Sequence, residues 1–399
     1  MDRVSIVNVK VYSEDEIYDP GYVTFERGRI IDVGYFSEHE VQDLSFDKMI
    51  KLSPSYSLIP GMIDLHIHGA GGYDTMDATE ESLRSISTIL PQEGTTSYLA
   101  TTITQHGEAI EAALLNVRHY IEHKNKSGHA EVLGIHLEGP FINQNRAGAQ
   151  PNEHIILPSV DLFKKWQTLA NGNIKLVTMA PELDKDHQLT KYLNDSKVVT
   201  SIGHSDATYE EAMEGFQVGI SHATHLYNGM KGLHHREPGV VGAALLDQKV
   251  LVEIIADGIH VRPEMIELAY KLKGKNGIIL VTDAMRAKCL GDGQFELGGQ
   301  QVIVKNKEAT LADGTLAGSI LKMNEAVLNM KTYTGCSLED IIQMTSLNPA
   351  KQLRIDHRKG SIVIGKDADL VVLNEKLEVY MTVCLGEIAF KDSLEEDGQ

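Results

Sequence analysis

Eight short apolar segments recur through the middle of the chain, and stretches with helical spacing lie between many of them. Strands that alternate with helices predict a parallel sheet, and eight such strands predict a closed (β/α)8 TIM-like barrel. Such a barrel occupies about 250 residues, so a chain of 399 residues has room for a second, smaller module. The apolar segments are 58–68, 96–104, 132–140, 174–182, 198–206, 219–228, 251–260 and 277–285, and the helical stretches are 79–94, 106–126, 160–172, 207–219 and 263–274.

A doubly wound open sheet is the alternative fold for strands that alternate with helices. It predicts a glycine-rich phosphate loop of the form GxGxxG after the first strand. The glycine-rich stretch at 69–72 reads GAGG and lacks that order. The closed barrel is therefore favoured.

Both ends of the chain differ from the middle, because they consist of short strands with period-two alternation. Since the barrel must be contiguous, we predict a small, discontinuous β-sandwich domain from residues 1–57 and 358–399, with the barrel at 58–357. Turn signals at DG, GG and DG predict a β-hairpin insertion at about 286–318, which would lie over the open end of the barrel.

The composition is acidic, with a net charge of −19, which argues against a nucleic-acid partner or an anionic membrane surface. The three cysteines, Cys289, Cys336 and Cys384, are widely spaced and predict reduced thiols. The chain starts with an alternating segment in place of the apolar core of a signal peptide, and no apolar run reaches the roughly 18 residues of a membrane helix. We therefore expect a cytoplasmic protein.

Metal-type ligands lie where the apolar segments end. His66 and His68 are two residues apart, so in a strand both side chains face the same way, toward one cation. The C-terminal ends of barrel strands form the face on which such barrels build their sites. Imidazole and carboxylate groups suit zinc or another first-row divalent ion with a position left for water, which predicts a metal-dependent hydrolase. The candidate metal ligands are His66, His68, Glu138, His204 and His225, and Asp283 ends the last segment.

Each of these residues also has an ordinary alternative role. A single histidine among the 17 in the chain is more often a surface or core residue than a ligand. Glu138 or Asp283, taken alone, could cap the segment that follows it. Ligation is favoured because the candidates converge on the ends of several different strands.

Nearly the whole chain resembles the amidohydrolase superfamily, through motifs that include LIPGMIDLHIHG, SIGHSDA, VTDAM and LADGTLAGS. The motifs HLEGPF, HLYNGM, HREPG and IADGIH narrow the resemblance to the enzymes that deacetylate amino-sugar phosphates. The resemblance implies hydrolysis of N-acetyl-D-glucosamine 6-phosphate to D-glucosamine 6-phosphate and acetate in amino-sugar catabolism.

The resemblance also implies roles at the metal centre. Glu138, His204 and His225 are implied as the main metal ligands, and Asp283 as the residue that activates water and protonates the leaving amine. One or two divalent ions of the Zn, Fe, Co or Mn type per subunit are implied, because some relatives lack imidazoles at the first strand and use one metal. Here His66 and His68 are both present, which allows a second ion with Glu138 as the bridge.

A second set of residues is implied to bind the substrate. Arg236 and His260 are implied as phosphate contacts, and one of them could reach across the subunit boundary of a homodimer. Asn228 and Gly229, which follow His225 closely, could donate hydrogen bonds to the same sugar. Gln150 occupies a place where relatives carry His and is implied to contact a sugar hydroxyl.

Two other functions remain open from the sequence. A cyclic-amide hydrolase of the dihydroorotase or dihydropyrimidinase type shares the HxH motif and the barrel, but it should carry a lysine at the end of the fourth strand. Here the lysine of that strand, Lys175, lies at the opposite end. A non-enzymatic assembly protein on the same barrel should have a broken ligand set, and in this chain the set is complete.

Overall fold

The computed structural model describes residues 3–37 and 46–392 and contains the closed barrel that the sequence predicts. Eight parallel strands follow one another around the barrel in chain order. The ring closes through a parallel bridge between Ile67 and Ala284 and a 2.8 Å hydrogen bond from the Asp283 N–H to the His66 carbonyl. The open-sheet alternative is therefore excluded. The barrel strands are β6 (Met62–Ile67), β9 (Thr95–Thr102), β10 (Glu131–Glu138), β11 (Ile174–Met179), β12 (Val199–Ile202), β13 (His222–Ala223), β14 (Leu251–Ile255) and β15 (Ile278–Val281).

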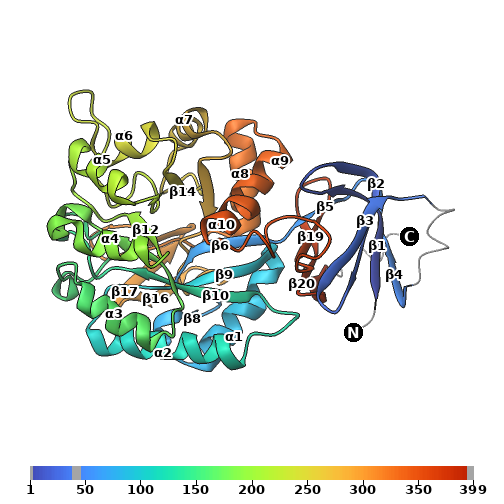
Figure 1. Ribbon diagram of the computed structural model, residues 1–399, viewed down its shortest axis with the longest axis horizontal. Coiled ribbons are helices and arrows are strands. Elements are labelled where there is room, and N and C mark those ends of the chain that lie inside the picture. The colour runs from blue at the N-terminus through green and yellow to red at the C-terminus, as the bar shows by residue number, and fades with distance from the viewer. Residues whose placement is uncertain (1–2, 38–45, 393–399) are drawn as a thin grey trace.

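Helices cover the outside of the barrel (Figure 1). The five helical stretches that the sequence predicts are all present, and four of these helices begin at a side-chain cap. Three further helices, α4, α6 and α8, were not predicted. α4 has no side-chain cap, and α6 is buried from Gly239 to Leu245, so it shows no amphipathic period. These barrel helices are α1 (Glu80–Ile89), α2 (Gly107–His123), α3 (Val160–Leu169), α4 (Gln188–Asp195), α5 (Tyr209–Val218), α6 (Gly239–Leu246), α7 (Pro263–Lys273) and α8 (Met323–Thr334).

Shorter elements complete the barrel. The chain leaves it through α9 (Leu338–Ile342), a π-helix (Gln343–Leu347) and α10 (Asn348–Gln352). After β6, the strands β7 (Gly69–Ala70) and β8 (Tyr73–Asp74) pair as a small hairpin. Single 3-10 turns lie at Thr75–Asp77, Leu90–Glu93, Gln144–Arg146, Asn152–His154, Pro181–Leu183 and Lys185–His187.

Strands from both ends of the chain form one mixed, eight-stranded sheet beside the barrel (Figure 1). β1 pairs with β2 along one edge and with both β4 and β5 along the other. Apolar side chains of the N-terminal and C-terminal strands share one buried core. Residues 1–2, 38–45 and 393–399 of the predicted terminal domain lie outside the described residues. The strands are β1 (Val4–Tyr12), β2 (Ile17–Glu26), β3 (Arg29–Tyr35), β4 (Lys48–Lys51), β5 (Ser57–Pro60), β19 (Leu370–Leu373), β20 (Val379–Cys384) and β21 (Glu387–Lys391).

The chain passes from the terminal sheet into the barrel at Gly61, between β5 and β6. A Cβ atom at this position would lie 2.1 Å from Thr96 Oγ1, so the close approach requires glycine. The Gly61 N–H donates to the Asp369 carbonyl at 2.9 Å, and the Asp369 carboxylate pairs with the buried Lys359. Lys359 Nζ also lies 2.8 Å from Glu131, the first residue of β10, so this charged group joins the terminal sheet to the barrel.

The hairpin expected after the eighth barrel strand forms two strands of a three-stranded antiparallel sheet. The first turn uses Gly298 and Gly299, as the GG signal predicts. The second turn uses Asn306 and Lys307, whose φ values of 53° and 70° are of the kind that usually selects glycine. This turn therefore carries no strong sequence signal, and the third strand was not expected. The strands are β16 (Gly293–Leu297), β17 (Gln300–Lys305) and β18 (Glu308–Thr310).

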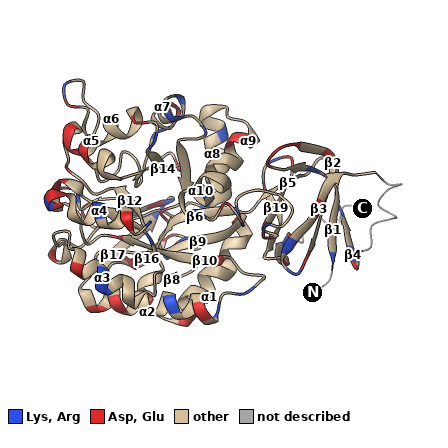
Figure 2. Cartoon of the chain, viewed as in Figure 1, with Lys and Arg blue, Asp and Glu red and all other residues tan. Residues whose placement is uncertain are grey.

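Acidic side chains are spread over the outer helices of the barrel and are not gathered on one face in this view (Figure 2). Glu80 and Glu81 lie in the first turn of α1, and Glu210 and Glu211 lie in the first turn of α5, where negative charge is favourable. Within residues 3–37 and 46–392, no helix is long and apolar enough to cross a membrane.

Candidate metal centre and substrate cavity

Glu138, His204 and His225 meet in the mouth of the barrel, where β10, β12 and β13 end. Glu138 Oε1 lies 3.1 Å from His204 Nε2 and 3.1 Å from His225 Nε2. The two imidazole nitrogens are themselves 3.1 Å apart, and all three side chains are buried. Two imidazole nitrogens and a carboxylate oxygen that face one point form a donor set for a divalent cation.

His66, His68 and Asp283 form a second group beside the first. His66 Nε2 lies 3.5 Å from Glu138 Oε1 and 3.3 Å from Asp283 Oδ1. His68 Nε2 lies 3.3 Å from Glu138 Oε2 and 3.4 Å from Asp283 Oδ1. Glu138 therefore faces both groups, so the structure brings all six residues of the predicted centre together around one carboxylate.

Three residues of this centre have a left-handed backbone at the end of their strand. The φ values are 48° for His204, 33° for His225 and 47° for Asp283. Such conformations cost about 1 to 3 kcal/mol each in a non-glycine residue and occur mainly at functional sites. Gly229 leaves space for the His204 imidazole, because a Cβ atom at residue 229 would lie 2.9 Å from His204 Nδ1.

A fully buried carboxylate, Glu253, contacts residues of both groups. Glu253 Oε2 lies 3.0 Å from His66 Nδ1 and accepts the His225 backbone N–H at 3.0 Å. Its other oxygen lies 2.9 Å from His222 Nε2. Glu253 thus fixes one residue of each group. Both ring nitrogens of His136 face other groups, because Nδ1 lies 3.2 Å from the Leu65 carbonyl and Nε2 lies 2.7 Å from Thr178 Oγ1. Burial lowers the pKa of His136 to about 3, which keeps its imidazole neutral.

Both carboxylates of the centre are charged at neutral pH. Burial alone would raise the pKa of Glu138, but the charge of His66 and the hydrogen bonds of His204 and His225 hold it well below its usual value. Burial acts in the same direction on the pKa of Asp283, and the nearby His66 and the His68 hydrogen bond outweigh it. The carboxylates therefore attract positive charge into a buried place.

The two first-strand imidazoles respond to the negative charge of these carboxylates. Burial would lower the pKa of His68, but the hydrogen bonds to Asp283 and Glu138 raise it to about 9. His66 Nε2 is buried among the same oxygens and makes no hydrogen bond. Imidazole nitrogens that face buried carboxylates without completing a hydrogen-bond network fit a divalent metal ion as the group that neutralises the centre.

A cavity of about 230 Å³ opens over these residues. Gln150 Nε2 donates to Glu138 Oε2 at 2.8 Å and so connects the cavity wall to the metal centre. Leu297 and Leu316, from the inserted sheet and the loop after it, add an apolar wall. Four of the five predicted substrate-binding residues line the cavity, namely Gln150, Asn228, Gly229 and His260.

Arg236, the fifth, lies outside the cavity of its own chain. It is exposed on the loop between β13 and α6, where its Nη1 lies 2.8 Å from His235 Nε2. A contact between Arg236 and a substrate in this cavity therefore requires either a movement of the loop or a second subunit.

Two buried or half-buried carboxylates of the site were missed by sequence reasoning. Glu253 is a charged residue within the apolar run LVEII, and that interruption was the available signal. Asp257 lies within the motif IADGIH, three residues before His260, and hydrogen-bonds to it. The apolar wall at Leu297 and Leu316 carried no comparable signal, because isolated leucines are ordinary core residues.

Known proteins match almost the whole chain. The N-acetylglucosamine-6-phosphate deacetylase of Bacillus subtilis (strain 168) is 49% identical over 391 residues, 98% of each chain. The structure of N-acetylglucosamine-6-phosphate deacetylase from Thermotoga maritima is 37% identical, with a TM-score of 0.87, over 97% of this chain and 100% of that chain. A mutant of the Mycobacterium smegmatis deacetylase, solved in complex with N-acetyl-D-glucosamine-6-phosphate, is 26% identical, with a TM-score of 0.90, over 98% of this chain and 100% of that chain. The pattern of the amidohydrolase family matches residues 57–389, and the chain therefore belongs to the amidohydrolase family.

Proposed function

We propose that this protein is a metal-dependent deacetylase that hydrolyses N-acetyl-D-glucosamine 6-phosphate to D-glucosamine 6-phosphate and acetate in amino-sugar catabolism. The observation that carries the proposal is the placement of Asp283 beside two groups of imidazoles that share Glu138, at the floor of a cavity. The identity of 49% to the Bacillus subtilis deacetylase over nearly the full chain supports the same activity.

The cofactor is one or two divalent ions of the Zn, Fe, Co or Mn type per subunit. Glu138, His204 and His225 would hold the first ion, and His66 and His68 would hold a second with Glu138 between them. When bound, such an ion supplies Lewis acidity, which polarises an amide carbonyl and makes a water molecule more acidic.

Asp283 acts as general base and then as general acid. Its lowered pKa keeps it ionised in the resting enzyme, so it can accept a proton from the attacking water. It then donates that proton to the amide nitrogen as the C–N bond breaks, which releases acetate and the free amine. In the one-metal form, where no second ion takes their Nε2 atoms, His66 and His68, 3.3 and 3.4 Å from Asp283 Oδ1, hold the carboxylate in place for both transfers.

The phosphorylated sugar is bound by groups at the rim of the cavity. Asn228 and Gly229 supply hydrogen bonds, Gln150 contacts a sugar hydroxyl, and His260 contacts the phosphate. Arg236 completes the phosphate site from the second subunit of a homodimer, because its exposed side chain does not line the cavity of its own chain. A short-range cationic contact is required, since a chain of net charge −19 does not attract an anion over long distances.

We place the reaction in the cytoplasm, with a small amino-sugar phosphate as the partner and no role for nucleic acid or membrane. The three cysteines are free thiols, which fits a reducing compartment.

The test is acetate release from the purified, metal-loaded protein with N-acetylglucosamine 6-phosphate, and unphosphorylated N-acetylglucosamine as the control. We expect rapid release from the phosphorylated sugar only. Hydrolysis of dihydroorotate or a hydantoin in its place would favour the cyclic-amide alternative. That alternative is weakened by Lys175, whose Nζ donates to the Gly172 carbonyl at the start of β11, away from the metal centre.

A further inference from the structure

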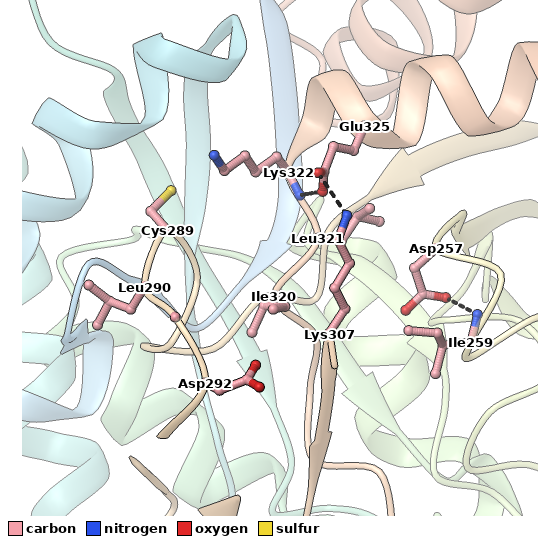
Figure 3. A pocket seen from close by; sticks show the side chains of 11 residues that line it. Asp257, Ile259, Cys289, Leu290, Asp292, Lys307, Ile320, Leu321, Lys322 and Glu325 are labelled. Atoms are coloured by element: carbon pink, nitrogen blue, oxygen red, sulfur yellow. Dashed lines mark hydrogen bonds and ion pairs between the residues drawn. The ribbon is translucent and has the colours of Figure 1, made fainter. Parts of the chain in front are cut away.

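The turn after β14 closes on one carboxylate. Asp257 Oδ1 accepts the backbone N–H groups of Ile259 and His260, both at 2.8 Å, and the first of these bonds is drawn in Figure 3. Asp257 Oδ2 lies 2.6 Å from His260 Nδ1. Three hydrogen bonds to one side chain within four residues fix both the turn and the plane of the imidazole.

Asp257 and His260 line two different cavities. His260 lines the cavity over the metal centre, whereas Asp257 lines a second cavity of about 310 Å³ (Figure 3). The side chains of His260 and Asp257 are only 7% and 9% exposed, so their mutual hydrogen bond is shielded from water. Since Asp257 occupies Nδ1, Nε2 is the ring atom of His260 that remains for a ligand in the metal-centre cavity.

The protonation of His260 decides what this ring atom can do. A neutral imidazole that donates its Nδ1–H to Asp257 presents a bare Nε2, which repels the oxygens of an anion. A doubly protonated imidazole donates to Asp257 and to an anion at the same time. Burial would lower the pKa of His260, but the Asp257 hydrogen bond and charge, with a smaller contribution from Asp283, raise it.

We propose that Asp257 is a positioning residue for the deacetylation, which holds His260 as a charged donor aimed at the phosphate of the substrate. The inference rests on the proposed function, because it takes the phosphorylated sugar as the ligand of His260. Asp257 itself acts through His260 and touches no reacting atom.

The substitution Asp257→Asn tests the charge while keeping the turn. The amide oxygen can still accept the Ile259 and His260 N–H groups, so the NH2 group must face His260 Nδ1 and disfavours the doubly protonated ring. We expect KM for N-acetylglucosamine 6-phosphate to rise about tenfold with kcat within about twofold, because a charge-assisted hydrogen bond becomes a neutral one. Asp292→Asn is the matched control: Asp292 lines the same second cavity and accepts the Asn306 N–H, and this variant should behave as the parent.

A double-mutant cycle separates this role from a purely structural one. His260→Gln keeps a neutral donor and leaves the turn intact, so it should raise KM by a similar factor. The combined variant should then lose little more than either single variant. Additive losses would overturn the proposal, since they would mean that Asp257 acts independently of His260.

The protonation of His260 can also be measured without substrate, by NMR of the 15N-labelled histidines, with His260→Gln used to assign the signal. We expect Asp257→Asn to shift the titration of His260 to lower pH, with thermal unfolding to verify the fold. An unchanged titration overturns the proposal. If the parent protein releases no acetate from the phosphorylated sugar, the proposed function fails, and the titration still decides whether Asp257 controls the charge of His260.

Discussion

Asp283 has a left-handed backbone conformation, and its carboxylate is buried beside two histidines. Its φ of 47° at the end of β15 places the carboxylate beside both histidines of the HxH motif, which lower its pKa against the effect of burial. Asp283→Asn keeps the shape and removes the base. We expect kcat to fall by about 10² to 10⁴. Metal content and the unfolding temperature should stay close to those of the parent, and turnover within a few-fold of the parent would assign the base to another residue.

The two groups around Glu138 make a separate prediction about metal content. His66→Gln combined with His68→Asn removes two imidazoles and leaves Glu138, His204 and His225 intact. We expect the double variant to bind one fewer divalent ion per chain than the parent, measured by elemental analysis after dialysis. Equal metal content in the two proteins would show that the first-strand histidines hold no ion.

The residues of the centre could be predicted because each one is a polar group at the end of an apolar strand, where a buried charge is costly unless it is paired or binds a metal. The role of Glu253 could not be predicted in this way. The residue lies inside β14, and its role depends on His66 of β6 and on the His225 N–H beyond the end of β13, which only the closed barrel brings to it. Arg236 was named from its motif, but its place relative to the cavity depends on a loop that one chain leaves exposed.

At the level of elements, Glu253 works as a cross-link between three barrel strands. Glu253→Ala removes the acceptor of His66, His222 and the His225 backbone, and it leaves a cavity in the barrel interior. We expect metal affinity to fall about 10- to 100-fold, as for other groups that orient metal ligands, and the unfolding temperature to fall with it. Glu253→Gln, which retains an oxygen and the volume, is the matched control and should lose less in a metal titration followed by calorimetry. Equal affinity in all three proteins would contradict this role.

Some helices and strands could be predicted from the residues within them, and others could not. Helices with a side-chain cap and an amphipathic period could be predicted, whereas α6, with the sequence GVVGAALL, is packed on nearly every side and has no period to find. The inserted sheet shows the same limit, because the turn at Asn306 and Lys307 is stabilised by its strands and not by glycine. Neither feature is encoded by a short-range pattern.

At the scale of the whole molecule, a charge network joins the terminal sheet to the barrel. Glu131 at the start of β10 lies 2.7 Å from Arg358 and 2.8 Å from Lys359. Burial would raise the pKa of Glu131, but Lys359 and Arg358 lower it. Glu131→Gln should reduce the free energy of unfolding by about 2 to 4 kcal/mol at pH 7, because it leaves buried cations with less compensation.

The pH dependence of this loss has a definite sign. A carboxylate with a lowered pKa stabilises the folded protein above its unfolded pKa of about 4.3. That contribution disappears as the pH falls through the lower, folded pKa, so the difference between Glu131→Gln and the parent should shrink in acid urea titrations. Glu267→Gln removes an exposed pair with Lys271 on α7 and serves as the control, with a change of less than about 0.5 kcal/mol. A loss that is constant down to pH 3 would contradict the ionic origin.

Assembly leads to the last prediction, because Arg236 does not line the cavity of its own chain and the proposed function supplies it from a second chain. Arg236→Ala should lower kcat/KM for the phosphorylated sugar by about two to three orders of magnitude and barely change the slow reaction of the unphosphorylated sugar. If Arg236 serves the neighbouring cavity, a mixed dimer of Arg236→Ala and Asp283→Asn chains contains one site with neither lesion. Mixing the two inactive proteins under conditions of subunit exchange should therefore restore activity, up to about a quarter of the parent at equal amounts, since half of the dimers are mixed and each has one of two sites intact. Confirmed exchange without any recovery would place Arg236 in the site of its own chain and would require its loop to fold back over the cavity.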